Sequence, residues 1–541
     1  MKSIKTILSS AAVAVALVAT SSCNVLDLGP IDYYGSGNFW TTESQFDGYV
    51  YTLNNYLRNS CSNHAIIFGE LRGGLYKTGS GSSDGSTRLN GEIVTQNFDE
   101  DHTGVSNFGG YYGAITQTNL FIKQLENTEI LPEAKKKNYL GIAYGIRAFL
   151  YFDLYRTYGA VPLRLDTAVI DGELDPLKLY MARHTPDEVI KQIKEDLKSS
   201  LANFGDDKSW DKYNHGSKIT WSKAATEYLA GEVYLWNAKV AVSDINGTHA
   251  AEPGDITAAK TYFENVVSNY GLSLVSSYAD VFKTTNKANS EVIFAIRYKE
   301  DEAGNGIVSN YTHMTDGRGV LMNQVNADGT TFGDPLDLRG AGGQWYEYAD
   351  ELYLSYNPED KRRDATFVPC YSKPEFDKGN VVLLTTVVKK NIGHTNTSGV
   401  HVWDADQIYY RLPGALLALA EIANYEGNNA KVEEYINQVR ERAYGANWAD
   451  EFKYVAGSFE QNELAILAEK DKEFVQEGQR WWDLRRMTTV KGGAETDHLV
   501  FSEKAPISGA VLPTSQAYKV LWPIDKTLRN SDKELKQTVG Y

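Results

Sequence analysis

The chain has 541 residues and a formal charge of −16 at pH 7, with 42% hydrophobic and 23% charged residues. This is the composition of an ordinary globular protein, so wholesale disorder is excluded. Nucleic acid is excluded as a ligand, because phosphate recognition needs clustered Lys and Arg and the chain contains no long basic run. Aromatic residues make up 12% of the chain. Most are expected in the core, and the others could stack on sugar faces or peptide side chains.

The N-terminal segment has the pattern of a secretory signal. Two lysines precede an apolar run over residues 7–19, and Thr20-Ser21-Ser22-Cys23 follows. As a helix this run would reach only about 20 Å, short of the ~30 Å hydrocarbon core, so residues 1–22 are predicted to be a signal peptide and not a transmembrane span. The small residues before Cys23 are similar to a bacterial lipobox, although Thr20 replaces the usual aliphatic residue. Cys23 is therefore predicted to be acylated with fatty chains such as palmitate and to anchor the protein.

The two other cysteines, Cys61 and Cys370, could pair in an oxidising compartment. Their distance along the chain leaves the geometry open. Free buried thiols are the preferred interpretation, because scaffolds held together by disulfides contain far more cysteine than this chain does.

Helical patterns dominate the residues from about 107 to 272. The run 134–158 carries apolar residues at three- and four-residue spacing, with small residues at Gly141 and Gly145 that would let a neighbouring helix approach, and Gly159 supplies a stop. Thr185-Pro186-Asp187-Glu188 is a capping-box pattern that predicts the start of the next helix. Two further helices are expected over 221–240 and 258–270.

Between about 273 and 405 the pattern changes to short β-rich runs, such as 292–296 and 381–388, separated by clusters of Gly, Asn and Asp. Helices are then expected over 409–425 and 432–443, and a long final helix from Ser458 to Met487, with Gln461 completing a second capping box. This order predicts a mostly α fold. A tetratricopeptide-like scaffold of helix pairs (107–272 and 406–490) would carry a loop-rich insert (273–405) with short β-strands, although no clean repeat period is visible.

Several long motifs resemble those of the SusD/RagB family. They are GIRAFLYFDLYRTYGAVPL at 145–163, the helix-pair residues within 410–443, EKDKEFVQEGQRWWDLRR at 469–486, and the closing segments 521–524 and 537–541. The resemblance covers residues 23–541 apart from the middle loops. It implies a lipoprotein on the outer face of the outer membrane that captures oligosaccharides and delivers them to a SusC-like TonB-dependent transporter. Two alternatives stay open: peptides as the ligand, as in the RagB branch, and a tetratricopeptide adaptor that binds no small ligand.

The resemblance also implies ligand sites in the loops after the first helix and in the insert. The candidate residues there are Arg72, Tyr76, Asn107, Phe108, Tyr311, Trp345 and Tyr346. The aromatic rings would stack on the ligand, and Arg72 and Asn107 would bond its hydroxyls or carbonyls. Packing within the loops is the competing interpretation for each of them. The arginines at 147, 480, 485 and 486 could be mistaken for an anion site, but structural ion pairs with nearby acids are expected instead.

No enzyme motif is convincing in its context. Residues 81–85 match G-x-S-x-G, but they lie in a Gly/Ser-rich loop and not between a buried strand and a helix. No zinc, P-loop or EF-hand pattern occurs. The acidic segments 99–101 and 244–255 could hold calcium, although solvated loops are the preferred interpretation. We therefore expect a binding protein with no catalytic residues, no metal and no cofactor.

Overall fold

The computed structural model describes residues 39–61, 64–78, 87–103, 108–168, 170, 175–313 and 324–541. The signal peptide, the lipidation site Cys23 and the candidate ligand residue Asn107 lie outside these ranges, as does the G-x-S-x-G match at 81–85. The predictions made for them stay predictions.

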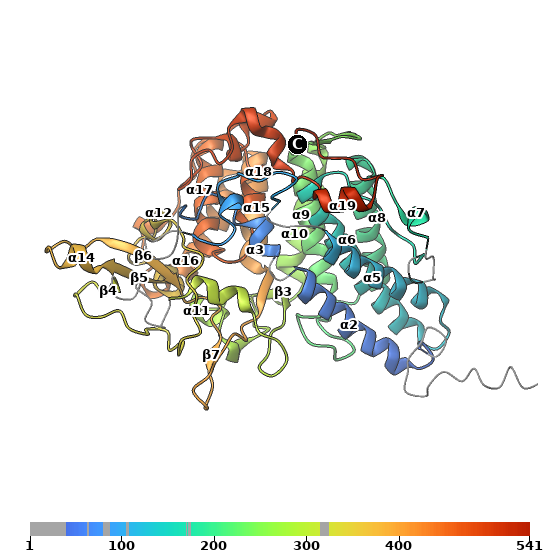
Figure 1. Ribbon diagram of the computed structural model, residues 1–541, viewed down its shortest axis with the longest axis horizontal. Coiled ribbons are helices and arrows are strands. Elements are labelled where there is room, and N and C mark those ends of the chain that lie inside the picture. Colours follow the sequence, from blue (N-terminus) through green and yellow to red (C-terminus); the bar gives the residue numbers. More distant parts are fainter. Residues whose placement is uncertain are drawn as a thin grey trace, which may run out of the picture.

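Helices form most of the fold (Figure 1). The long helices are α2 (Glu43–Cys61), α5 (Gly109–Asn127), α6 (Glu133–Tyr158), α8 (Pro186–Phe204), α9 (Lys223–Lys239), α10 (Ile256–Asn269), α15 (Leu412–Glu426), α16 (Asn429–Tyr444) and α17 (Phe459–Glu473). The short helices are α3 (His64–Gly69), α4 (Gly91–Val94), α7 (Pro176–Leu179), α11 (Tyr278–Val281), α12 (Asp350–Leu354), α13 (Lys361–Thr366), α14 (Lys373–Phe376), α18 (Arg480–Arg486) and α19 (Lys526–Ser531).

Long helices that follow one another in the chain pack side by side: α2 on α5, α5 on α6, α6 on α8, α9 on α10, and α15 on α16 (Figure 1). The contact of α10 with α15 joins the two helical parts across the insert. Both predicted capping boxes are present, at Thr185 and Ser458. The mostly α, tetratricopeptide-like fold predicted from the sequence is therefore confirmed.

Small residues let these helices approach closely, as predicted. A Cβ atom added at Gly145 of α6 would lie 2.1 Å from Nε1 of Trp221, and one at Gly141 would lie 2.9 Å from the ring of Phe204. Both neighbours are themselves buried in the core. The close spacing between α6 and its neighbours therefore requires that residues 141 and 145 have no side chain.

Replacing Gly145 by Ala is expected to lower the free energy of unfolding by about 1–3 kcal/mol, because the new methyl group overlaps the Trp221 indole. Gly113 in α5 is a matched control, since a Cβ there meets nothing within 4 Å. Gly113→Ala should be neutral or should stabilise by up to ~1 kcal/mol. Urea unfolding of the two variants checks this, and equal stabilities would contradict the packing argument.

Nine short strands form four small antiparallel sheets within the described residues. They are β1 (Val242–Asp244) with β2 (Gly247–His249); β3 (Val292–Ile296) with β9 (Gln407–Arg411); β4 (Gln324–Val325), β5 (Phe367–Ser372) and β6 (Leu383–Val388); and β7 (His394–Thr395) with β8 (His401–Val402). The β3–β9 pair connects the start of the insert to the second helical part, with Val292 opposite Arg411.

Two predicted helix boundaries are wrong. Residues 409–411 belong to β9, in which Tyr410 and Arg411 pair with the buried strand β3. Helix α15 begins only at Leu412, with Pro413 in its first turn. The helix predicted over 458–487 is two helices, α17 and α18. The break between them contains Gln476 and Gly478, both with positive φ, and a Cβ at Gly478 would lie 2.1 Å from the carbonyl oxygen of Ala65.

Cys61 and Cys370 are both buried free thiols, so the preferred interpretation for them is confirmed. None of the helices in the described ranges is long and apolar enough to cross a membrane.

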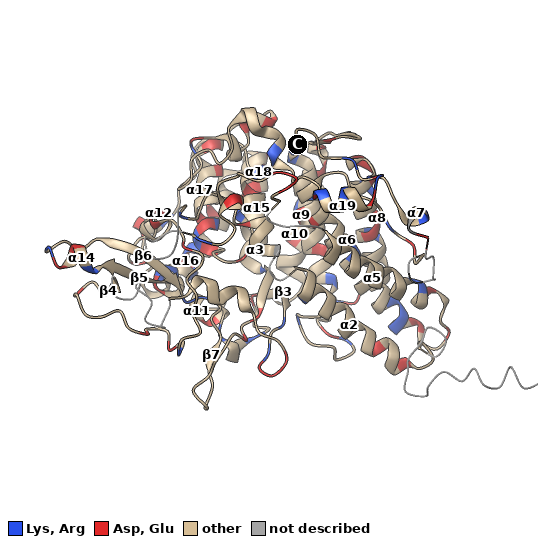
Figure 2. Ribbon diagram, viewed as in Figure 1, with Lys and Arg blue, Asp and Glu red and all other residues tan. Residues whose placement is uncertain are grey.

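Charged residues of both signs lie along α16 and α17 (Figure 2). Some of these side chains belong to a buried ion-pair network, in which Glu473 of α17 contacts Arg411, Arg442 and Arg362. These three arginines come from β9, α16 and α13, so the network joins the insert to the helical scaffold. The predicted structural role also holds for Arg147, Arg480 and Arg486, which pair with Asp196, Asp471 and Glu421. Arg485 forms no ion pair with any residue that the structure describes.

Candidate ligand-binding site

An open hollow of about 560 Å³ lies where the end of α2, the residues before α4 and the segment 303–310 of the insert meet. We call it the insert hollow. Its wall includes Arg58, Leu89, Asn90, Ile307, Asn310 and Tyr346. Guanidinium and amide groups beside aliphatic and aromatic surface are what a hydrophilic ligand with apolar faces requires.

Tyr346 is the predicted site residue that the structure places in this wall. Its side chain is only 3% exposed, and its ring lies 5.0 Å from the ring of Tyr311 behind it. The Asn90 amide donates a hydrogen bond of 2.6 Å to the Tyr346 hydroxyl, and the Tyr346 amide N–H donates to the Asn310 carbonyl at 2.8 Å. Burial raises the pKa of Tyr346 to about 12. The ring is thus fixed in orientation before any ligand arrives.

Trp345 is half-buried beside Tyr346. The guanidinium of Arg88 lies 4.4 Å from the Trp345 ring centroid, and the Arg88 amide N–H donates to the Trp345 carbonyl at 2.9 Å. A ring that is held at its backbone and still partly exposed can stack on a ligand with little loss of conformational entropy. Tyr346 lines the insert hollow, whereas Trp345 precedes it in the chain and is partly exposed without lining the hollow. Both therefore stay candidates for ligand contact.

Tyr76 and Tyr311 support this wall from behind. Tyr76, Tyr311 and Tyr348 are buried with their rings against one another, and the Tyr76 hydroxyl lies 2.8 Å from that of Tyr311 and donates to Glu70 at 2.9 Å. Burial raises the pKa of Glu70, and its bonds from Tyr348, Tyr76 and two backbone amides act in the opposite direction. Tyr76 and Tyr311 are buried and, unlike Tyr346, do not line the insert hollow, so the prediction that they stack on a ligand is wrong. They position Tyr346 instead.

Arg72 and Phe108 are also core residues, so the predictions that they face the ligand are wrong. The Arg72 guanidinium lies 3.9 Å from the ring of Trp481 and 4.7 Å from that of Phe98, and its Nε donates to Gln96 at 2.8 Å. Phe108 packs against Tyr158, with the ring centroids 5.2 Å apart. Packing partners from distant parts of the chain bury these loop residues.

A second hollow of about 270 Å³ adjoins the first and shares Arg58 with it. The Arg58 guanidinium donates to Glu302 at 2.7 Å and to the Arg297 carbonyl at 3.3 Å, so this side chain separates the two spaces in a fixed position. Sequence reasoning missed Arg58, Asn90 and Asn310. No local motif marks them, because only the fold brings α2, the residues before α4 and the insert together.

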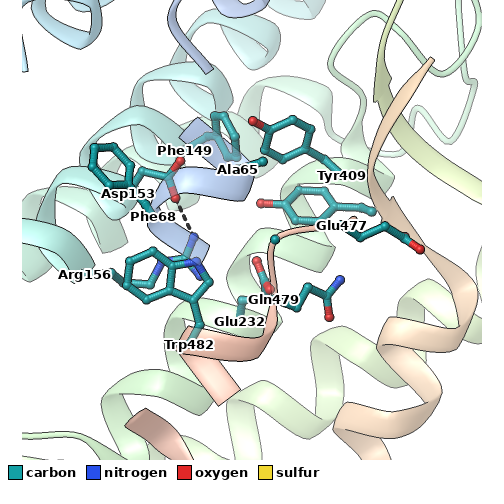
Figure 3. A pocket seen from close by; sticks show the side chains of 12 residues that line it. Ala65, Phe68, Phe149, Asp153, Arg156, Glu232, Tyr409, Glu477, Gln479 and Trp482 are labelled. Carbon is teal, nitrogen blue, oxygen red and sulfur yellow. Dashed lines mark hydrogen bonds and ion pairs between the residues drawn. The ribbon is translucent and has the colours of Figure 1, made fainter. Parts of the chain in front are cut away.

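A third cavity lies inside the helical scaffold, where the carboxyl groups of Asp153 and Glu232 lie near Tyr409 and Trp482 (Figure 3). Glu477 also lines it, but its carboxyl points away and accepts from Arg411 and Lys390. Asp153 accepts from Arg156 at 2.5 Å and from Tyr111 at 3.1 Å. Burial raises the pKa of Glu232. Grouped carboxyls can indicate acid–base catalysis, but this cavity has a volume of about 40 Å³. That space holds roughly three waters and no sugar ring.

The acidic segments considered for calcium have basic neighbours. Glu100 pairs with Arg529, Asp101 with Lys526, and Asp244 with Arg183. Within the described ranges, no three side chains of His, Cys, Asp or Glu are grouped as a metal site would require.

The chain is similar to proteins of one family over most of its length. Residues 290–541 match the model of the SusD family, and residues 82–235 match a family described as starch-binding and associating with the outer membrane. Solved structures that are similar to the chain include two from Bacteroides fragilis. A SusD superfamily protein from Bacteroides fragilis is 48% identical with a TM-score of 0.86, over 93% of this chain and 100% of that one. NanU of B. fragilis is 31% identical with a TM-score of 0.78, over 95% and 100%. The SusD-like protein P38 of Formosa agariphila is 22% identical over 100% of both chains.

Proposed function

The chain belongs to the SusD family, and from this premise we propose that it binds oligosaccharides at the cell surface and delivers them to a SusC-like TonB-dependent transporter in the outer membrane. The glycan class is supported by the family description that residues 82–235 match, which names starch binding and the outer membrane.

The observation that carries the proposal is the insert hollow with its fixed aromatic wall. Tyr346 is held by Asn90 and backed by Tyr311. Trp345, which precedes it in the chain, does not line the hollow but is partly exposed beside it. Sugar rings present apolar C–H faces that stack on such rings and hydroxyls that bond to amide and guanidinium groups. Asn90, Asn310 and Arg58 supply those groups along the same wall.

We propose that Cys23 is acylated and holds the protein on the outer face of the outer membrane. An apolar run followed by small residues and this cysteine supports the proposal. Two or more fatty chains on one cysteine give the double signal that stable anchoring needs.

The protein acts, in this proposal, by binding and release without bond cleavage. The grouped carboxyls of the internal cavity have no room for a substrate, and the wall of the insert hollow offers amides, a guanidinium and rings.

Incubating the purified protein with mixed oligosaccharides and peptides, followed by mass spectrometry, tests the proposal. Glycans should be retained intact, no shortened product should appear, and a large outer-membrane β-barrel should co-purify from cells. Retention of peptides alone would replace glycans by peptides as the ligand. Partner proteins without any retained small molecule would favour the adaptor alternative, and shortened products would contradict the non-catalytic role.

A further inference from the structure

A pocket of about 190 Å³ lies between β1, α18 and the C-terminal segment, and it shares no residue with the insert hollow. Its residues come from 241–243, Arg485, Glu495, the 3₁₀ turns at 517–520, Leu521 and Val539. One water needs about 10–15 Å³ by this measure, so the space would hold on the order of a dozen waters or one small organic molecule.

The pocket has a buried floor and an exposed rim. Arg485, Val242 and Leu521 are buried, whereas Val539 is 56% exposed and Tyr518 is also open to solvent. The walls are mostly aliphatic, and Arg485 supplies the only positive charge among the lining residues. A solvent molecule can therefore reach a cation that lies at the bottom of an apolar space.

Arg485 is unusual because its buried guanidinium forms no ion pair with any described residue. Its Nη1 donates to the Arg156 carbonyl at 2.5 Å, and its Cζ lies 5.0 Å from the Trp236 ring centroid. Arg486, its neighbour in the chain, pairs with Glu421 and Asp483. Buried charges are normally paired, since the lost hydration is otherwise uncompensated.

Arg72, the other buried arginine discussed above, differs in its surroundings. The rings of Trp481, Phe98 and Trp522 lie against its guanidinium, and Arg72 is fully buried and does not line this pocket. Arg485 alone of these two combines an unpaired guanidinium with an accessible pocket.

We propose that this pocket binds a small aliphatic monocarboxylate. The carboxylate oxygens accept hydrogen bonds from Arg485, whose planar fork matches their geometry, and the hydrocarbon tail lies against Val242 and Leu521. The anion supplies the counter-charge that the fold does not, and the aliphatic walls favour a tail over a second polar group.

The charge state of the site suits this ligand at neutral pH. Burial lowers the pKa of Arg485 to about 9, against the opposing effect of Glu495, so the guanidinium stays protonated at pH 7. Glu495 is exposed on the rim and forms no ion pair with Arg485. It competes with the ligand for the same cation, and its removal should strengthen carboxylate binding.

Titration of butanoate into the full-length protein, followed by ligand-observed NMR, tests the proposal. Butanoate should bind at least about tenfold more tightly than 1-butanol, which has a similar chain without the charge. Arg485→Gln should weaken binding at least about tenfold, and Glu495→Gln should strengthen it. Val539→Trp should block the pocket from its exposed rim without touching the core, and Val490→Trp is its control at a similarly exposed valine outside the pocket.

Equal binding of butanoate and 1-butanol, or binding that survives Val539→Trp, would overturn the proposal. If Arg485→Gln fails to fold, Val539→Trp still decides the question. If Glu495→Gln destabilises the protein and butanoate does not bind, Glu495 is the partner of Arg485 and the pocket has no such ligand. None of these outcomes bears on glycan binding in the insert hollow.

Discussion

Replacing Glu473 by Gln is expected to lower the free energy of unfolding by about 3–5 kcal/mol, the usual loss when one partner of a buried ion pair is removed. Glu473 is fully buried and contacts three guanidinium groups, with Arg411 at 2.5 Å and Arg362 at 3.0 Å. Gln keeps the shape of the side chain and removes its charge. The arginines would then remain buried with fewer counter-charges.

Glu434→Gln is a matched control, because Glu434 pairs with Lys431 at 2.8 Å on the surface of α16. An exposed pair of this kind contributes less than about 1 kcal/mol. Urea unfolding at pH 7 measures both variants. Equal losses for the two would show that the buried network does not hold the insert on the scaffold.

Lowering the pH should reduce the free energy of unfolding more steeply in the wild-type protein than in the Glu473→Gln variant. Burial alone would raise the pKa of Glu473, but Arg442, Arg411 and Arg362 outweigh that effect and hold it well below its usual range. A carboxyl with a depressed pKa in the folded state contributes stability above about pH 4.5 that is lost as the pH falls. Unfolding free energies measured between pH 7 and pH 3 should therefore decline with a smaller slope in the variant. Parallel slopes would contradict this role of Glu473.

Replacing both Trp345 and Tyr346 by Ala is expected to weaken glycan binding about 30-fold. Each stacked ring contributes ~1 kcal/mol, and about 2 kcal/mol corresponds to that change in affinity. The helical circular-dichroism signal should stay the same, because neither residue lies in a helix. Isothermal titration with the oligosaccharide retained by the wild-type protein provides the measurement.

Two further variants separate binding from stability in this experiment. Tyr346 is buried, so Tyr346→Phe is added to remove only the hydroxyl that Asn90 contacts. Trp448→Ala is the control, since Trp448 is similarly half-buried but packs against Tyr444 of α16, away from the insert hollow. Unchanged affinity in the double variant, or an equal loss in Trp448→Ala, would refute the assignment of the aromatic wall.

The helical scaffold could be predicted because residues close together in the sequence specify its helices. Apolar spacing, the Thr185 and Ser458 caps and the stop at Gly159 each act within a few residues, and the helices that they predict are present. The wrong predictions occur where a segment far away in the sequence determines the local secondary structure. Tyr410 is in a strand because it pairs with Phe294 of β3. The Gly478 amide N–H donates to the Glu70 carboxylate, which holds the turn between α17 and α18.

The site could be predicted only in part for the same reason. Trp345 and Tyr346 were predicted because the family resemblance implies ligand sites in the insert, and the structure places Tyr346 in the wall of the insert hollow. Whether a loop side chain faces solvent depends on residues far away in the sequence, and Arg72 is buried because Trp481 and Trp522 pack on it. Arg58 and Asn90 were missed because only the folded chain places them beside Tyr346.

The most direct measurement is a crystal structure of the protein soaked with the oligosaccharide that it retains. We predict electron density for an intact glycan in the insert hollow, with a sugar ring against Trp345 or Tyr346 and hydroxyls within hydrogen-bond distance of Asn90, Asn310 or Arg58. A glycan bound at another surface, or an empty hollow at saturating concentrations of glycans that the protein binds in solution, would contradict the account.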